Sequence, residues 1–235
     1  MNIIVTGAGR GIGYETAKWL SENHKVICIS RSAEKNKIKG TIAISFDFEN
    51  GNIQNELLPK LIKVLSKEKK AAIIDVLINN AAAFIKKPFQ KITPEDWEKL
   101  FKVNVFSVAE LTRSILESPL SPIHKNNGPR AHVLNIASMG GIQGSVKFPE
   151  LSAYSTSKGA VITLTECLAE EFKEKNISFN AIAFGAVQTE MLSKAFPGFK
   201  APFTAKDAAM FTADFALTGQ KYFNGKVLQM ALSTP

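Results

Sequence analysis

Cysteine and histidine are scarce in this sequence. The 235 residues include two cysteines and three histidines. Cys28 lies in an apolar run and Cys167 in a helical pattern, with no C-x-x-C spacing, so both are typical of small buried hydrophobic residues in a reducing compartment. The histidines share no metal-ligand spacing. The sequence therefore predicts neither a disulfide framework nor a metal site.

Long apolar runs and biased segments are also missing. No run approaches the roughly 18 to 20 apolar residues of a membrane span, and the N-terminus leads directly into a strand-like segment. No repeat, linker or low-complexity segment divides the chain, so we expect one domain over residues 1–235. These absences predict a cytoplasmic protein with no membrane partner.

Positive charge exceeds negative charge, with a formal net charge of +8. Such an excess suits nucleic acid, a membrane surface, or a phosphate-rich or acidic ligand. The lysines are dispersed, however, and they form no basic stripe interleaved with aromatic residues. We therefore expect no nucleic acid partner. Salt-sensitive binding to random duplex would overturn that expectation.

Short β-branched runs alternate with longer amphipathic stretches. The predicted strands cover residues 2–6, 25–30, 41–46, 73–78, 131–137, 178–184 and 226–231. The predicted helices cover residues 12–22, 52–67, 94–117, 153–175 and 205–217. Apolar strands separated by helices indicate an α/β, doubly wound fold whose seven-stranded, mostly parallel sheet has helices on both faces. Only residues 31–40 join the second and third strands, so a helix there should be short or irregular.

A glycine-rich turn, TGAGRGIG at residues 6–13, follows the first predicted strand and opens the first helix. Gly7, Gly11 and Gly13 permit a tight turn and close backbone approach. The helix that begins there offers free N–H groups and a positive dipole to a pyrophosphate. Position 12 is Ile12, so the turn does not match G-x-G-x-x-G. We expect a dinucleotide here, and an ordinary tight turn is the alternative.

The residues at the end of the second strand indicate which dinucleotide binds. An acidic residue there would bind a ribose 2′-hydroxyl, whereas Arg31 suits a 2′-phosphate, and Ser30 leaves no acidic competitor. Arg10, in the glycine loop, could supply a second cation. The two arginines favour NADP(H) over NAD(H). A solvated surface charge is the alternative for either of them.

Seven short motifs occur in a characteristic order. They are TGAGRGIG (6–13), DF (47–48), NNAA (79–82), KVNV (102–105), NIAS (135–138), YSTSK (154–158) and NAIAFGAVQTEM (180–191). Through them the sequence resembles the short-chain dehydrogenase/reductase family over nearly its whole length. Within that family it looks most like the 3-oxoacyl-[acyl-carrier-protein] reductase branch. The resemblance implies an NAD(P)-binding Rossmann domain and an oxidoreductase (EC 1.1.1.-) that prefers NADPH.

The resemblance implies four catalytic residues, Asn104, Ser138, Tyr154 and Lys158. Tyr154 would be the general acid or base. Lys158, one helical turn later, would lower the pKa of the phenol and hold the nicotinamide ribose. Ser138 would hydrogen-bond the substrate carbonyl, where negative charge develops. Asn104 would hold a water that links the lysine to solvent. A hydride would then pass between nicotinamide and a carbonyl or secondary alcohol.

The resemblance also implies a cofactor-binding set. Its members are Gly7, Arg10, Gly11, Ile12, Gly13, Arg31, Asp47, Phe48, Asn80, Ala81, Tyr154, Lys158, Val187 and Thr189. Asp47 would contact the adenine amino group, and Phe48 would lie beside the adenine ring. Val187 and Thr189 would contact the nicotinamide carboxamide. Asn79 is expected to be structural instead, bridging two strands.

Three departures from the family pattern surround the expected pocket. Phe184 stands where the family has proline, and Ala82 stands where glycine is usual. The segment between Ser138 and Tyr154 is a few residues longer than is common, so residues 139–152 should be reshaped. None of these changes removes a catalytic group, but they leave the substrate undetermined.

The segment after Thr189 is expected to form a mobile flap. Its apolar residues are Met191, Leu192, Phe196, Phe199 and Phe203, and Met139 and Phe148 come from the other loop. They favour an apolar ketone or a 3-oxoacyl thioester as substrate, although aromatic residues that only pack the flap down are the alternative. The helices at 94–117 and 153–175 are expected to form a dimer or tetramer. An NADP(H)-sensing regulatory protein without turnover is the alternative function.

Overall fold

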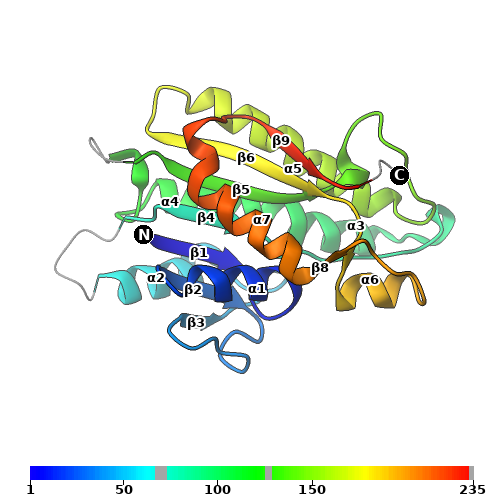
Figure 1. Cartoon of the computed structure of the whole chain (residues 1–235), viewed down its shortest axis with the longest axis horizontal. Coiled ribbons are helices and arrows are strands. Elements are labelled where there is room, and N and C mark those ends of the chain that lie inside the picture. The colour runs from blue at the N-terminus through cyan, green and yellow to red at the C-terminus, as the bar shows by residue number, and fades with distance from the viewer. Residues whose placement is uncertain (67–72, 125–128, 233–235) are drawn as a thin grey trace.

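The computed structural model describes residues 1–66, 73–124 and 129–232 (Figure 1). The strands are β1 Asn2–Thr6, β2 Lys25–Ser30, β3 Ile42–Ser45, β4 Val76–Asn79, β5 Ala131–Ser138, β6 Ile177–Phe184, β7 Val187–Gln188, β8 Phe203–Thr204 and β9 Val227–Met230. The α-helices are α1 Gly11–Leu20, α2 Leu58–Leu65, α3 Pro94–Phe101, α4 Ser107–Leu116, α5 Ser152–Glu171, α6 Glu190–Ala195 and α7 Ala205–Thr218. Two π-helical turns, η1 Ile53–Leu57 and η3 Lys102–Phe106, precede α2 and α4. The 3₁₀ turns are η2 Phe89–Lys91, η4 Pro122–His124, η5 Met139–Gly141 and η6 Gly219–Lys221.

Seven strands form one sheet in the order β3-β2-β1-β4-β5-β6-β9, and every neighbouring pair is parallel. The chain runs outward from β1 to β3, returns to β4 beside β1, and then runs outward in the other direction. The strand order therefore reverses between β1 and β4, and ligands bind beyond the carboxyl ends of strands at such a point. The predicted doubly wound α/β fold is confirmed.

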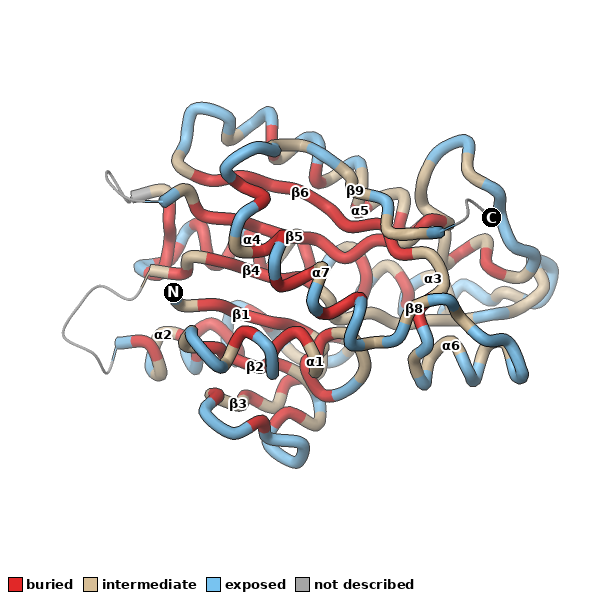
Figure 2. The backbone as a smooth tube through the Cα atoms, in the orientation of Figure 1, coloured by how far each residue is buried: buried red, intermediate tan, exposed pale blue. Residues whose placement is uncertain are grey.

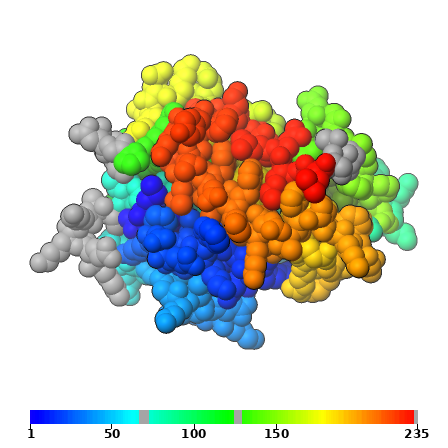
Figure 3. All heavy atoms as spheres, viewed as in Figure 1, coloured from blue at the N-terminus to red at the C-terminus, as the bar shows by residue number. Residues whose placement is uncertain are grey.

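Helices cover both faces of this sheet. Successive residues of a strand point to opposite faces, and in β1 Ile4 packs with the buried side chains of α2 and α4, whereas Val5 packs with those of α1 and α7. Figure 2 shows the central strands buried almost along their whole length. In Figure 3 the blue N-terminal part and the orange and red C-terminal part cover the face on which α1 and α7 lie. The core is thus two apolar layers with the sheet between them.

Several helices and strands begin, end or are interrupted at residues other than those predicted. The strand predicted at 73–78 is wrong at its start, because β4 begins at Val76, and the amide of Ile74 instead donates to the Leu120 carbonyl. The connection at 31–40 holds turns and no helix. The helix predicted at 94–117 is interrupted by η3, and the one predicted at 52–67 begins with η1. Residue 67 lies outside the described residues.

Two structures between β6 and α7 were not predicted. β7 and β8 form a separate two-stranded parallel sheet, and α6 lies between them in sequence. Figure 1 shows α6 and β8 at the carboxyl edge of the main sheet. The segment expected to be a mobile flap therefore contains regular structure. Within the described residues, no helix has the length and apolar character needed to cross a membrane.

Candidate active site

The glycine loop turns sharply between β1 and α1. Gly7 and Gly11 have φ angles of 68° and 59°, in the left-handed region that glycine adopts freely. A Cβ atom on Gly13 would lie 2.3 Å from Nδ2 of Asn80 and 2.6 Å from the Gly7 carbonyl oxygen. Among the residues that the structure describes, no side chain caps α1 at Arg10, so the N–H groups of its first turn have no side-chain partner there. The loop and helix start therefore fit a pyrophosphate.

The end of β4 holds the glycine loop in place. The backbone amides of Asn80 and Ala81 both donate to Oγ1 of Thr6, at 2.9 and 3.0 Å, and Nδ2 of Asn80 donates to the Thr6 carbonyl at 3.0 Å. Asn80 and Ala81 thus lie beside the glycine loop, where the strand order reverses. Nδ2 of Asn79 donates to Oδ1 of Asn135 at 2.9 Å, which confirms its predicted role as a bridge between β4 and β5.

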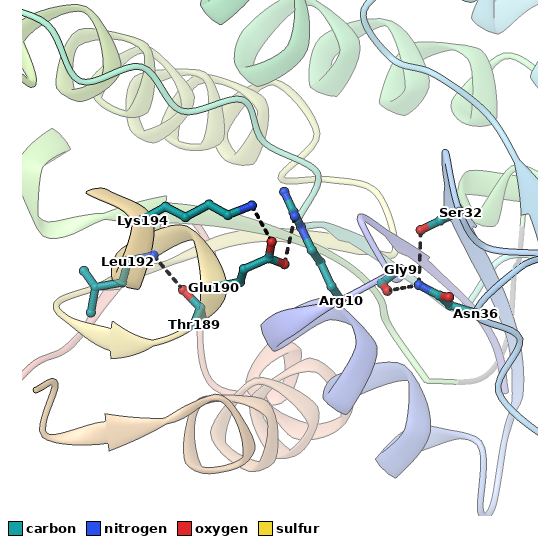
Figure 4. A network of polar contacts seen from close by, with 8 residues as sticks. All are labelled: Gly9, Arg10, Ser32, Asn36, Thr189, Glu190, Leu192 and Lys194. Carbon is teal, nitrogen blue, oxygen red and sulfur yellow. Dashed lines mark hydrogen bonds and ion pairs between the residues drawn. The ribbon is translucent and has the colours of Figure 1, made fainter. Parts of the chain in front are cut away.

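Arg10 is already paired with a carboxylate. Its Nη1 atom donates to Oε2 of Glu190 at 2.9 Å, and Lys194 binds the other oxygen of the same carboxylate (Figure 4). The side chains of Arg10 and Glu190 remain 60% and 51% exposed, so the pair is a surface ion pair. The sequence could not reveal this partner, since the two residues lie 180 positions apart.

An open cavity of about 350 Å³ lies beside the glycine loop. It is lined by Gly9, Arg10, Tyr14, Lys35, Asn36 and Lys37. Nδ2 of Asn36 donates to the Gly9 carbonyl at 2.9 Å and so holds the 31–40 segment against the glycine loop (Figure 4). Nearby, the buried Oγ of Ser30 has no hydrogen-bond partner among the described residues, and a Cβ on Gly9 would lie 2.7 Å from it. The lining holds three cations and no acidic residue.

Lys35 and Lys37 were not predicted as cofactor-binding residues from the sequence. Their only signal is a run of lysines shortly after Arg31, which is also typical of a solvated turn.

Arg31 itself is exposed, and its charge acts on Asp47. Burial raises the pKa of Asp47, but hydrogen bonds from the Glu49 amide and from Asn50, helped by Arg31, bring it below its usual value.

Other predicted cofactor residues are partly engaged by the fold. The Phe48 ring is buried in the core, 5.1 Å from the Phe46 ring and edge-on to it, so its side chain is not free for a ligand. Val187 is buried within β7. Thr189 caps α6, since its Oγ1 accepts from the Leu192 amide at 3.2 Å (Figure 4). Ile12 packs partly against the core.

The structure brings Ser138, Tyr154 and Lys158 together. Ser138 ends β5, while Tyr154 and Lys158 lie one turn apart on α5. The Ser138 side chain lies close enough to the Tyr154 phenol to lower the pKa of that phenol. Nζ of Lys158 donates to the Ile136 carbonyl at 2.8 Å and lies 5.9 Å from the centroid of the Tyr154 ring. A phenol, a hydroxyl and an ammonium therefore converge at the carboxyl end of β5.

The expectation that Lys158 lowers the pKa of the Tyr154 phenol is wrong for the protein alone, because that pKa is raised. Burial raises the pKa of Tyr154 to about 12, and the Ser138 hydroxyl offsets only part of that rise. Lys158 is 3% exposed, and burial lowers its pKa to about 8. Its ammonium donates to the backbone of β5 rather than to the phenol. In this low-dielectric setting, desolvation outweighs the attraction between the two groups.

Asn104 lies in the π-helical turn η3. Its Oδ1 accepts from the Ala83 amide at 2.7 Å, and its Nδ2 donates to the Ala83 carbonyl at 3.0 Å and to Oγ of Ser157 at 2.9 Å. Oγ of Ser157 in turn donates to the Tyr154 carbonyl at 2.7 Å. The side chain therefore ties the segment after β4 to α5. The water relay assigned to Asn104 stays a prediction.

Phe84 completes the surroundings of Tyr154. The two ring centroids are 4.8 Å apart with an interplanar angle of 62°, an edge-to-face contact. Sequence reasoning missed Phe84, which follows the NNAA motif and belongs to no periodic pattern. Ala82 is half-buried in the same segment. One flank of the phenol is thus apolar.

The long segment before Tyr154 is packed on α5. A Cβ on Gly141 would lie 2.7 Å from the Gly159 amide nitrogen, so the turn η5 contacts the helix backbone closely. Oγ of Ser145 donates to the Met139 carbonyl at 2.6 Å and closes the loop on itself. Phe184 is buried at the end of β6.

Comparisons with known proteins give one consistent result. A family model described as short chain dehydrogenase matches residues 1–198. The uncharacterized oxidoreductase YvrD of Bacillus subtilis (strain 168) is 30% identical over 217 residues, which cover 91% of this chain and 78% of YvrD. The 3-oxoacyl-[acyl-carrier-protein] reductase FabG of Aquifex aeolicus (strain VF5) is 32% identical over 193 residues, covering 80% and 74%. A crystal structure of 3-ketoacyl-(acyl-carrier-protein) reductase from Brucella melitensis, complexed with NADH, has a TM-score of 0.83 at 24% identity and covers 97% of this chain and 96% of that one.

Proposed function

Since the chain belongs to the short-chain dehydrogenase family of oxidoreductases, we propose that it transfers a hydride between NADP(H) and a carbonyl or secondary alcohol. The observation that carries the proposal is the convergence of Ser138, Tyr154 and Lys158 on the edge of the sheet that also holds the glycine loop. The bound nicotinamide would supply the hydride. A regulator without turnover has no need of a phenol placed beside a serine hydroxyl and a lysine ammonium, so this cluster favours the enzyme.

Residues of this chain fit a phosphorylated dinucleotide. The uncapped start of α1 would bind the pyrophosphate, and the Lys158 ammonium would hold the nicotinamide ribose. The cavity beside Gly9 supports NADP(H) over NAD(H), because Lys35 and Lys37 line it and no carboxylate does. Arg10 would join them only after leaving Glu190.

The pKa values support reduction as the favoured direction. With a pKa of about 12, Tyr154 is protonated at neutral pH and can donate its proton to the oxygen of a carbonyl. Ser138 would hydrogen-bond the same oxygen, where negative charge develops. Lys158, with a pKa of about 8, carries its charge at pH 7. Alcohol oxidation would require a lower phenol pKa, which the residues of the chain alone do not provide.

The substrate we propose is an apolar ketone or a 3-oxoacyl thioester. Phe84 packs on Tyr154, and the rings of Phe148 and Phe196 lie 6.4 Å apart. Aromatic surfaces of this kind suit an apolar substrate. The Aquifex relative is named a 3-oxoacyl-[acyl-carrier-protein] reductase, which supports the thioester. We also propose a dimer or tetramer formed through the helices at 94–117, which are α3, η3 and α4, and through α5.

A screen for NADPH oxidation tests this function. The panel would hold acetoacetyl thioesters, small diketones, quinones and sugars. Tyr154→Phe should abolish turnover of any substrate found and leave NADPH binding nearly intact, because the ring contact with Phe84 remains and only the acid is lost. Tyr222→Phe is the matched control, since Tyr222 is 79% exposed. NADPH binding without turnover across the panel would favour the regulator, and full activity of Tyr154→Phe would refute the acid assignment.

A further inference from the structure

Lys86 joins three segments near Tyr154. Its Nζ atom lies 3.4 Å from Oε2 of Glu150, donates to the Ala195 carbonyl at 3.1 Å, and lies 4.4 Å from the centroid of the Phe196 ring. Glu150 belongs to the loop before α5, whereas Ala195 ends α6 and Phe196 follows it. One side chain therefore makes an ion pair, a charged hydrogen bond and a cation–π contact with two segments far from it in sequence.

Glu150 is held in an unusual backbone conformation at this point. Its φ of 69° is the only positive value at a non-glycine residue among those described. The carbonyl of Glu150 accepts from the Lys87 amide at 3.0 Å, so consecutive residues hold both its backbone and its side chain. Strained backbone persists only where neighbouring contacts fix it. Lys86 and Lys87 supply such contacts immediately before α5 begins.

Each of the three segments also carries an aromatic residue, and one of these rings contacts the candidate site. Phe84, two residues before Lys86, packs edge-on against Tyr154. Phe148, two residues before Glu150, faces Phe196 at 6.4 Å. Lys86 therefore fixes the two chain segments that carry Phe148 and Phe196 relative to the segment that carries Phe84.

We propose that Lys86 is a positioning residue for the substrate side of the reaction. Its ammonium holds the end of α6 and the 139–152 loop in the arrangement that binds the carbonyl substrate beside Tyr154. This inference rests on the proposed function for its kinetic part. Lys86 touches no residue of the glycine loop or of the cavity beside Gly9 among its described contacts, so NADP(H) binding should not depend on it.

Charge, rather than bulk, is the property that Lys86 contributes. Its side chain is 30% exposed and that of Glu150 is 39% exposed, so a methionine of similar length could occupy the same space. Methionine would lose the ion pair, the hydrogen bond and the cation–π contact together. Arginine would keep a cation and donors in the same place. Lys86→Met and Lys86→Arg are therefore the informative pair.

The kinetic test compares these variants with Lys91→Met. Lys91 is an exposed lysine in the same loop, and its side chain makes no hydrogen bond or ion pair with the described residues. Lys86→Met should raise KM for the carbonyl substrate about fivefold to tenfold, as expected when the charged contacts of one partly exposed side chain are lost. We expect kcat and the Kd for NADPH to change less than about twofold, and Lys86→Arg to restore KM. An unchanged KM, an equal rise in Lys91→Met, or failure of arginine to restore KM would overturn the proposal.

Hydrogen exchange tests the same inference without a substrate. In Lys86→Met, peptides covering residues 139–152 and 190–199 should exchange faster than in the wild type, while those of the glycine loop should not change. Lys91→Met should match the wild type throughout. Equal exchange in Lys86→Met and wild type would refute the role of Lys86 whatever the kinetics show. If no panel substrate turns over but exchange rises as described, the proposed function fails and the structural role of Lys86 stands.

Discussion

Replacing Lys158 by methionine should remove NADP(H) binding, leave the stability of the fold nearly unchanged at pH 7, and make the variant less stable than the wild type as the pH rises above 8. Lys158 is 3% exposed, and its Nζ has a single described partner, the Ile136 carbonyl at 2.8 Å. No carboxylate of the described residues forms a salt bridge with it. A buried, unpaired ammonium costs free energy of folding. Methionine fills similar space without a charge.

The magnitude follows from the pKa. Burial lowers the pKa of Lys158 from 10.5 to about 8. At about 1.4 kcal/mol per pKa unit, keeping the charge inside the fold costs about 3 kcal/mol. The methionine variant leaves the Ile136 carbonyl without this donor, which costs about 1 to 3 kcal/mol. These opposing contributions nearly cancel at pH 7, so the decisive measurement is the dependence of stability on pH.

The sign of that dependence is fixed by which state holds the proton. Below pH 8 Lys158 is protonated in both the folded and the unfolded chain. Between about 8 and 10.5 the unfolded chain binds more protons, so the free energy of unfolding rises with pH. This rise should amount to about 2 kcal/mol between pH 8 and 10. Tyr154 acts oppositely, but only above pH 10, because its folded pKa is raised to about 12.

Urea unfolding of wild type and Lys158→Met at pH 7, 8, 9 and 10 measures this difference. Burial also raises the pKa of Cys28, but that contribution is common to both proteins and cancels. Lys175→Met, which changes an exposed lysine just beyond α5, is the control and should follow the wild type. Parallel profiles for wild type and Lys158→Met would refute the reasoning. So would undiminished NADPH binding by the variant.

Two further predictions concern the cofactor side of the site. Replacing Lys35 and Lys37 by alanine should weaken NADPH binding about tenfold or more and NADH binding much less, because two cations leave the cavity beside Gly9. The measurement is the Kd for both nucleotides. Equal losses of affinity for NADPH and NADH would remove the argument that these lysines bind the 2′-phosphate. Glu190→Gln should tighten NADPH binding about twofold to fivefold and do so less in high salt, because it frees Arg10 from a surface ion pair. Weaker NADPH binding in Glu190→Gln would show that the pair supports the bound state instead.

Sequence reasoning succeeds here where a pattern is local. The strands at 2–6 and 25–30 are apolar runs bounded by turn residues, and the structure has them at the same positions. The spacing of Tyr154 and Lys158 places both on one face of a helix, as α5 confirms. Their approach to Ser138 follows from parallel strands that end at one edge of the sheet. Each of these inferences needs only neighbouring residues and the element order.

The rest depends on contacts between distant residues. The π-helical turn that carries Asn104 has no signature in the KVNV motif, and neither do the bonds of Asn104 to Ala83 and Ser157. The pairing of Arg10 with Glu190 joins two loops that sequence treats separately. The pKa of Tyr154 was expected to fall, but burial, which sequence does not measure, raises it. Long-range packing and desolvation therefore limit what the sequence can predict.

The short helix α6 explains why cofactor and substrate effects should be separable. Its first residue, Glu190, bonds Arg10 of the glycine loop, whereas its last residue, Ala195, bonds Lys86 of the segment after β4. The two contacts lie at opposite ends of one helix and share no residue, so substitutions at Glu190 and Lys86 should add without interaction. If they did not add, α6 would move as a rigid unit between the two sides. A double-mutant cycle in the Kd for NADPH and the KM for substrate distinguishes these cases, because only rigid motion makes Lys86→Met alter the effect of Glu190→Gln.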